Sequence, residues 1–401
     1  MNPGYQPLIS IVVPTRDRPD FARLAVEGLR RQSFDDFEVI VSDNALHRRF
    51  EPDPSIFDGV KFRYVQVPRP LWMADHYEFA VGHARGRYVG VQGDKSVLVA
   101  NALERVAREI RDGAPDTVSW RVGNYNPSTS DPAGHGYAVV PRREDPGSTR
   151  VPANEALEFL IATYLEPRFA ADHQLEIRGS IYHGVHSAGL LAAMRARFGR
   201  VFRFYAPDIT AQASALQIAT DVRHIPLSLE LVLAGPSNGI DVGVQVRRIL
   251  ETQRDAARGS SGVSPSLIPG LSASITHLLA CDVAGACGRS LRADEWEELH
   301  ARAAYDLYFL DGWPEPGMFA RERAALWVSA RRFGFGVQRR MVAGALAGKR
   351  AQWIRRVKEP IQRQLGERRL HEIRAARALR STLLARREFD RLFDALEASL
   401  A

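Results

Sequence analysis

Blocks of apolar and polar positions alternate along the first half of the chain, and they predict strands and helices in turn. The segment "LISIVVP" (8–14) is a continuous apolar, β-branched run, which is typical of a strand covered on both faces. The next segment, "RPDFARLAVEGLRRQ" (18–32), has apolar residues at helical spacing, and Pro19 suits its first turn. Strands and helices in alternation predict right-handed crossovers and a largely parallel sheet.

The alternation of predicted strands and helices continues as far as residue 123 and is then interrupted. The periodicity disappears over 124–150, where Pro, Gly and Ser are frequent, and a loop of that length is typically a functional lid or a disordered excursion. Beyond the loop the pattern returns. We predict strands at 37–44, 60–67, 87–92, 116–122 and near 176–183, and helices at 71–84, 101–113, near 153–165, at 187–198 and within 203–219.

A change of composition divides the chain. The segment "DAARGSSGVSPSLIPG" (255–270) is the clearest linker, and every later segment predicts helix. We therefore expect an α/β domain over 1–255, a linker over 256–270 and a helical domain over 271–401. A chain of 401 residues is also too long for one ordinary core.

The composition is that of an ordinary soluble protein, with 45% apolar and 25% charged residues. No stretch approaches the roughly 18 uncharged apolar residues that would span a bilayer, and the first residues do not form a secretory signal. Cys281 and Cys287 are too few for a disulfide framework and lack the paired spacing of a zinc site. We expect free thiols and a cytoplasmic location.

Polar side chains follow three of the predicted strands. Thr15 and Arg16 follow the first strand, Asp43 and Asn44 end the second, and Asp94 follows the strand at 87–92. The carboxyl ends of parallel strands meet at one edge of a sheet, where ligands bind. Paired acceptors and donors of this kind suit a nucleotide base and ribose, although the same residues also cap helices and close turns.

At these residues the chain resembles the family 2 glycosyltransferases of GT-A fold. The segment "ISIVVPTRDRPDFARLAVEGLRRQSFDDFEVIVSDNA" (9–45) has the family's order of strand, Pro-Thr, basic turn, helix and second strand. "HARGRYVGVQGD" (83–94) matches the strand that leads into the acidic metal motif. The resemblance covers residues 7 to 100 well and 101 to 235 loosely. It implies an inverting enzyme that uses a nucleoside-diphosphate sugar.

The resemblance also implies roles for single residues. The family's catalytic base is an Asp or Glu downstream of the metal motif, and Asp208 in "YAPDITAQ" fits, at a position that also suits a helix N-cap. Glu166 and Asp172 are alternatives for the base, and His183 is expected to touch the acceptor. The nucleotide site would be lined by Pro14, Thr15 and Arg16, with Asp43 and Asn44 at the base and Asp94 at the ribose and diphosphate.

The metal motif departs from the family's pattern. Further acids normally follow the position of Asp94, but here Lys95 and Ser96 stand there. Mg²⁺ or Mn²⁺ would neutralise the departing diphosphate, yet one carboxylate holds such an ion weakly. A lysine is a fixed cation that stabilises the same charge and repels a metal. Three readings stay open: a metal-independent enzyme that uses Lys95 and Arg16, a metal held by Asp94, or an inactive member.

Outside this motif, several aromatic residues offer either core packing or sugar-stacking surfaces. They are Trp72, Tyr77, Trp120, Tyr125 and Tyr182. The net charge of +7 is concentrated in the tail, where 349–391 contains fourteen Lys or Arg and five acids. This tail suits a solvated helical hairpin, or contact with an anionic membrane surface or lipid-linked acceptor, placing the protein at the inner face of the membrane. Nothing in the sequence indicates a nucleic-acid partner.

We therefore expect transfer of a sugar from a nucleotide donor to a saccharide or lipid-linked hydroxyl acceptor, in cell-surface polysaccharide or glycoconjugate synthesis. The alternative is an inactive nucleotide-sugar-binding or scaffolding subunit. A nucleotidyltransferase is disfavoured, because "PTRDRPD" is not the Gly-rich basic loop that such enzymes carry after their first strand.

Overall fold

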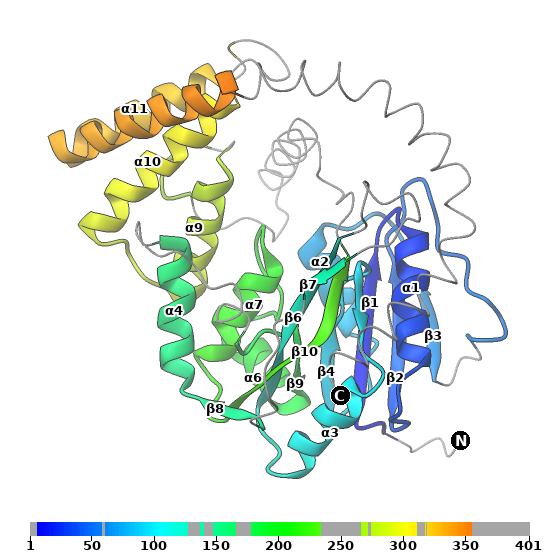
Figure 1. The fold of residues 1–401 in the computed structure, drawn as a ribbon. Helices are drawn as coiled ribbons and strands as arrows, with labels where there is room; N and C mark the ends of the chain where they lie inside the picture. Colours follow the sequence, from blue (N-terminus) through cyan, green and yellow to red (C-terminus); the bar gives the residue numbers. More distant parts are fainter. Residues whose placement is uncertain are drawn as a thin grey trace. The chain divides into compact units, whose positions relative to one another are not determined.

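The computed structural model describes residues 6–57, 61–126, 137–139, 147–165, 178–233, 266–271, 274–310, 317 and 319–354 (Figure 1). These residues belong to two compact units. The first contains one mixed sheet with helices on it. The second contains α9 (Ile275–Cys287), α10 (Ala293–Phe309), α11 (Ala320–Phe333) and a helical stretch over 335–354.

The strands of the first unit form a sheet in the order β3-β2-β1-β4-β9-β6-β10-β5. The half formed by β3, β2, β1 and β4 is parallel, β9 runs antiparallel between β4 and β6, and β6 and β10 are again parallel. Two short strands, β7 and β8, pair with β6 and β10. The bounds are β1 (Ile9–Thr15), β2 (Phe37–Asp43), β3 (Phe62–Gln66), β4 (Tyr88–Val91), β5 (Ser96–Leu98), β6 (Thr117–Asn126), β7 (Tyr137–Val139), β8 (Thr149–Val151), β9 (Gly184–Ser187) and β10 (Val222–Leu233).

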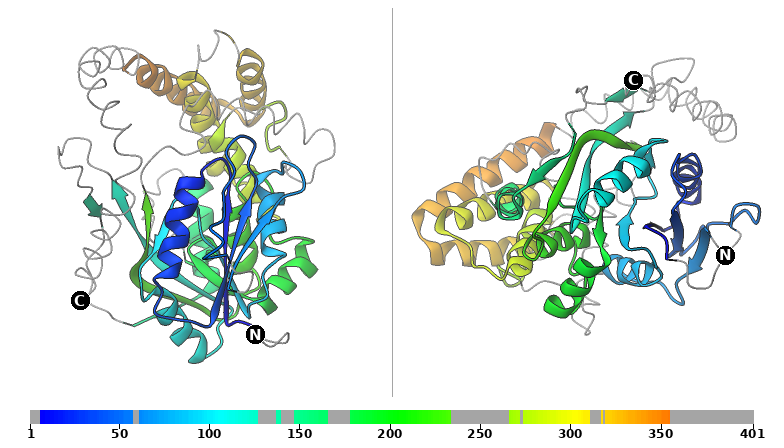
Figure 2. Two further views of the ribbon diagram at one scale, coloured as in Figure 1. Left: turned by 90° about the vertical axis from the view of Figure 1, so that its right-hand side faces the viewer. Right: turned by 90° about the horizontal axis from the view of Figure 1, so that it is seen from below.

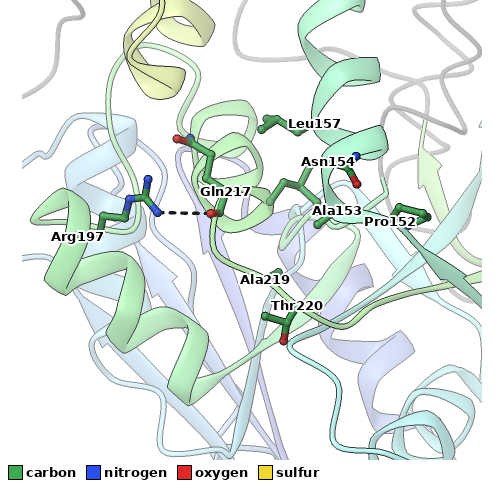
Figure 3. A pocket seen from close by; sticks show the side chains of 9 residues that line it. Pro152, Ala153, Asn154, Leu157, Arg197, Gln217, Ala219 and Thr220 are labelled. Atoms are coloured by element: carbon green, nitrogen blue, oxygen red, sulfur yellow. Dashed lines mark hydrogen bonds between the residues drawn. The ribbon is translucent and has the colours of Figure 1, made fainter.

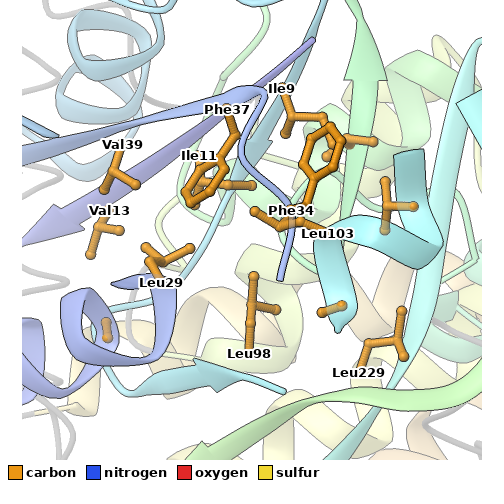
Figure 4. Packing of buried hydrophobic residues seen from close by; sticks show 14 of the residues in the cluster. Ile9, Ile11, Val13, Leu29, Phe34, Phe37, Val39, Leu98, Leu103 and Leu229 are labelled. Atoms are coloured by element: carbon orange, nitrogen blue, oxygen red, sulfur yellow. The ribbon is translucent and has the colours of Figure 1, made fainter. Parts of the chain in front are cut away.

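Helices cover both faces of this sheet (Figures 1 and 2). Successive side chains of a strand point to opposite faces, so an all-apolar strand contributes side chains to the hydrophobic clusters on both faces of the sheet. Ile11 and Val13 of β1 join the cluster under α1 (Pro19–Arg30) and α3 (Ala102–Arg111), which Figure 4 shows with Leu29 and Leu103. Val12 joins the other cluster, under α2 (Met73–Val81), α4 (Ala153–Leu165), α6 (Ala188–Phe198) and α7 (Pro207–Leu216).

The topology collects the ends of several strands at one edge. The parallel strands β1, β2 and β4 end there, and so do β6 and β10. Because β9 is reversed, the residues before it also lie at this edge: Val91 N–H donates to the Ile181 carbonyl over 3.0 Å, and Trp120 N–H donates to the His183 carbonyl over 3.0 Å. The edge therefore brings together residues from the whole length of the first unit.

Most predicted elements are confirmed, and three points differ. The strand predicted near 176–183 is wrong, because the described part of it, 178–183, forms turns and the strand is β9. The strands β5 and β10 were not predicted. The predicted loop over 124–150 contains the end of β6, β7 and the start of β8, and its remaining residues lie outside the described part.

The predicted domain boundary at 255 and most of the linker also fall outside the described residues. In the second unit the helices agree with the prediction, and both cysteines are free, Cys281 being buried. Among the residues that the structure describes, no helix has the length and apolar character required to cross a membrane.

Candidate active site

The carboxylate of Asp94 lies in the turn after β4, and both of its oxygens are engaged. Arg18 approaches it with two nitrogens, Nη2 at 2.7 Å from Oδ1 and Nε at 2.9 Å from Oδ2. The Thr15 hydroxyl, at the end of β1, donates to Oδ2 over 2.9 Å. Burial raises the pKa of Asp94, and the charge of Arg18 and the hydrogen bonds only partly offset that rise.

Two cations accompany this carboxylate. The side chain of Asp94 is 3% exposed, whereas that of Arg18 is 22% exposed. Lys95 is half-buried, with its ammonium nitrogen 5.9 Å from the centroid of the Phe21 ring in α1. Burial and the charge of Arg18 lower the pKa of Lys95. Two cationic side chains thus lie beside the carboxylate of Asp94.

The local backbone explains why Arg18 reaches Asp94. Asp17 adopts a left-handed conformation with φ of 56°, which Asp tolerates better than most residues, and α1 begins at Pro19. The Asp17 carboxylate accepts the backbone N–H groups of 46–48, at 2.9, 2.6 and 3.0 Å. These three donors outweigh burial and hold the pKa of Asp17 below its usual value. The turn is therefore fixed on both sides of Arg18.

Asp43 and Asn44 hold the surrounding loops. Asp43 is fully buried, and its oxygens accept the N–H groups of Ala45 and Phe50 and the Tyr64 hydroxyl, at 2.9 to 3.1 Å. Asn44 bonds Leu71 in both directions, at 2.8 and 2.9 Å. Both side chains shape the wall at the end of β2, and their contact with a nucleotide base stays a prediction.

Tyr77 and Tyr182 form an aromatic wall beside the two carboxylates. Their rings stack with centroids 6.3 Å apart and planes 13° apart. Burial raises the pKa of both hydroxyls, and the charges of Asp94 and Asp208 raise them further. Tyr182 also lies directly over Gly93, where an added Cβ would clash with its hydroxyl. Asp94 and Asp208, far apart in sequence, therefore lie near the same tyrosine pair.

Asp208 occupies the first turn of α7. The N-cap of this helix is Ala206, so the predicted capping position of Asp208 is wrong; the helix starts two residues earlier, because Pro207 takes its first position. Burial raises the pKa of Asp208, while its backbone hydrogen bond to Ile209 and the charge of His183 lower it by less. A carboxylate of raised pKa is suited to accept a proton.

His183 is oriented by a buried acid that was not among the predicted site residues. Its Nδ1 lies 3.0 Å from Oε2 of Glu230 in β10, and the Trp120 indole donates to the same oxygen over 3.0 Å. Glu230 is fully buried, and its Oε1 has no hydrogen-bond partner in the described part of the chain. Trp120 is therefore a core residue that holds Glu230, rather than a surface for stacking sugars.

The residues present do not fit the divalent cation that the family resemblance implies. Both oxygens of Asp94 are taken by Arg18 and Thr15, and Lys95 and Ser96 supply no carboxylate. Within the described ranges, no group of three or more His, Cys, Asp or Glu side chains is placed to hold a metal ion. The guanidinium stands where an ion would bind Asp94.

A separate cavity of about 600 Å³ lies at the far end of α7 (Figure 3). Pro152, Asn154, Leu216 and Thr220 are among its lining residues, and Arg197 donates to the Gln217 carbonyl over 3.5 Å. It is lined by no carboxylate or histidine, and Asp208 is at the opposite end of the helix. We therefore place the candidate active site at the sheet edge, around Asp94 and Asp208.

The structure thus brings together most of the predicted site residues. Thr15, Asp94, Lys95, His183 and Asp208 gather at this edge, with Pro14 buried in β1 and Arg16 following it. Glu166 and Asp172 lie outside the described residues. Sequence reasoning missed Arg18 and Glu230. A weak signal for Arg18 was the cluster of three charged residues in "RDR". A weak signal for Glu230 was the apolar alternation of "LSLELVL", which is typical of a strand.

Comparison with known proteins agrees with this architecture. Residues 10–161, from β1 into α4, match the model of glycosyl transferase family 2. This part of the chain is therefore similar to that family, and the fold is a mixed α/β sheet flanked by helices. No curated protein sequence matches the chain.

Several solved structures are similar at low identity. S. aureus TarS is 12% identical with a TM-score of 0.41, over 86% of this chain and 55% of that chain, so this chain spans about half the length of TarS. The fragment TarS 1–349 in complex with UDP-GlcNAc is 12% identical, with a TM-score of 0.42, over 86% and 90%. The mannosyltransferase PcManGT from Pyrobaculum calidifontis, in complex with GDP-Man and Mn²⁺, is 14% identical, with a TM-score of 0.38, over 88% of each chain.

Proposed function

We propose that the protein transfers a sugar from a nucleoside-diphosphate sugar to a hydroxyl acceptor, with inversion at the anomeric carbon. The convergence of Asp94 and Asp208 on the Tyr77–Tyr182 wall supports this proposal, together with the family match of 10–161. Asp94 marks the donor side, where β1, β2 and β4 end. Asp208 and His183 mark the acceptor side.

In this reaction Asp208 takes the proton of the acceptor hydroxyl while that oxygen bonds to the anomeric carbon. The bond from the anomeric carbon to the diphosphate oxygen breaks, and its electron pair leaves with the nucleoside diphosphate. His183, held by Glu230, would orient the acceptor. We place the reaction in the synthesis of a cell-surface polysaccharide or glycoconjugate, with the basic residues of 349–391 near an anionic membrane.

Replacing Asp208 by Asn tests the proposal, since the amide keeps the shape and removes the base. We expect turnover of UDP- or GDP-sugars to fall by about 10²- to 10⁴-fold, while calorimetry shows unchanged donor affinity. Asp20→Asn, at an exposed position of α1, is the matched control. A wild-type protein that binds donor but shows no turnover with any acceptor would instead favour the inactive binding or scaffolding subunit.

A further inference from the structure

We infer that the Arg18 guanidinium, with Lys95 beside it, takes the place of the divalent cation and binds the diphosphate of the donor. This inference rests on the proposed function, since it names the groups that hold the leaving group of that reaction. It makes Arg18, rather than Arg16, the partner of Lys95. The inference follows from the side chains around Asp94, which do not fit a metal ion.

The geometry of the ion pair presents the guanidinium to a ligand. The contacts with Asp94 use Nε and Nη2, and Nη1 has no hydrogen bond to the described residues. A planar guanidinium carries N–H donors on all three nitrogens, so a face of Arg18 stays available to phosphate oxygens. Thr15 fixes the position of the carboxylate behind it, with Oγ1 2.9 Å from Oδ2.

Burial separates the roles of the two partners. Asp94 is nearly inaccessible at 3% exposure and acts as the anchor, whereas Arg18 keeps 22% of its side chain exposed. A carboxylate behind an arginine fixes its orientation, in the way that outer groups orient the ligands of a metal. Arg18 is therefore held in place before the donor arrives.

The charge balance also favours an anion. Asp17 accepts backbone N–H groups of 46–48, and Asp20 pairs with Arg23 and Arg48 at 3.2 and 2.9 Å. Both nearby acids of this turn thus have other partners. Asp94 is the acid that pairs with Arg18, and Lys95 lies beside this pair. A diphosphate at the end of β4 would therefore meet the Arg18 guanidinium and the Lys95 ammonium without any ion.

In the reaction these fixed cations would stabilise the negative charge that develops on the diphosphate as the bond to the anomeric carbon breaks. Preoriented charges of this kind need no reorganisation during the reaction. Arginine suits this role, because its flat fork binds two oxygens of a phosphate at once.

The test measures how much the second phosphate adds to binding. Calorimetry of the full chain with UDP and UMP, and with GDP and GMP, is run in EDTA and then with Mn²⁺. We expect comparable diphosphate binding in both conditions. Arg18→Gln should weaken diphosphate binding in EDTA by about tenfold or more while monophosphate binding changes little. Arg23→Gln, at an exposed arginine of α1 close to Arg18 in sequence, is the matched control.

Arg18→Gln leaves Asp94 buried without its partner and is expected to lower stability. The double variant Arg18→Gln with Asp94→Asn removes both charges and keeps the test valid. If the double variant binds diphosphate in EDTA as tightly as the wild type does, Arg18 is only a structural partner and the inference fails. Diphosphate binding by the wild type that requires Mn²⁺ would overturn it as well, but would leave the proposed function standing. Failure of every nucleotide to bind in either condition would remove the proposed function itself.

Discussion

The charged side chains at the sheet edge differ in how far other groups of the protein already neutralise or hydrogen-bond them. Asp17 and Asp43 accept several hydrogen bonds from the loops around them, so they hold backbone in place. Asp94 is paired but presents its partner Arg18 outward. Asp208 has few partners and lies in surroundings that disfavour its charge. We therefore expect a ligand to meet the charges of Arg18 and Asp208.

The pH dependence of turnover should report the raised pKa of Asp208. A base must be deprotonated, so kcat/KM should fall as the pH drops through its pKa. Burial raises that pKa above the ordinary 3.8, so we expect the acidic limb at a higher pH than a solvated aspartate would give. The pH–rate profile of the wild type measures this. A profile that stays flat down to the ordinary pKa of aspartate would contradict the assignment.

At the scale of helices and strands, the aromatic wall depends on packing behind it. Phe202, which precedes α7, is fully buried and meets the Tyr77 ring of α2 edge-on, with centroids 5.4 Å apart. Tyr182, just before β9, stacks on the same Tyr77 ring. These ring contacts hold together α2, the start of α7 and the segment before β9, and they fix the shape of the wall at the site.

Phe202→Ala should lower the free energy of unfolding by about 3–5 kcal/mol, because it leaves a cavity under Tyr77. Denaturant unfolding measures the loss. Phe335→Ala, at a side chain that is 79% exposed, should change stability little and serves as the control. Equal effects of the two substitutions would show that Phe202 does not support the wall.

The sequence predicts elements whose signal is local and misses those set by distant contacts. The continuous apolar run of β1 and the amphipathic spacing of α3 are local, and both were predicted. β10 was missed because Pro226 interrupts its apolar alternation, and the structure accommodates Pro226 at a shift of register between Ile225 and Ser228. Its buried Ser228 and Glu230 also gave no core signal.

The site was predictable to the extent that its residues end strands. Thr15 and Asp94 follow from that rule, as does their meeting at one edge. The partner of Asp94 does not, because the conformation of Asp17 decides which arginine of "RDR" reaches a carboxylate 76 residues away. A sequence pattern carries no information about such a backbone turn.

Across the whole molecule, buried histidines couple stability to pH. Burial lowers the pKa of His76, His186 and His277 to about 4 and that of His224 to about 3. These rings are neutral when folded, whereas the unfolded chain binds protons below the ordinary 6.5. Their stabilising contribution is therefore complete above pH 6.5 and is lost as the pH falls toward 4. Asp94 and Asp208, whose pKa is raised, oppose this trend.

A substitution at His76 isolates one contribution. His76→Gln keeps a polar partner for the Ser42 hydroxyl, which lies 3.0 Å from Nε2. We expect the variant to lose less stability than the wild type between pH 6.5 and 4.5, by up to about 1.4 kcal/mol per pH unit. Urea unfolding at both pH values measures this. A variant whose stability falls with pH as steeply as that of the wild type would contradict the explanation.

The strand order determines when each part of the sheet can form while the chain is synthesised on the ribosome. The half of the sheet formed by β1 to β4 can pair once Val91 has emerged, because all four strands lie before residue 92. The half formed by β5, β6 and β8 cannot close until β10 emerges, because β10 pairs with all three. Until then those strands have open edges, and unpaired edges invite aggregation. A nascent chain would thus hold the β1 to β4 half of the sheet well before the sheet is complete, and a chain that stops before Val222 would never complete it.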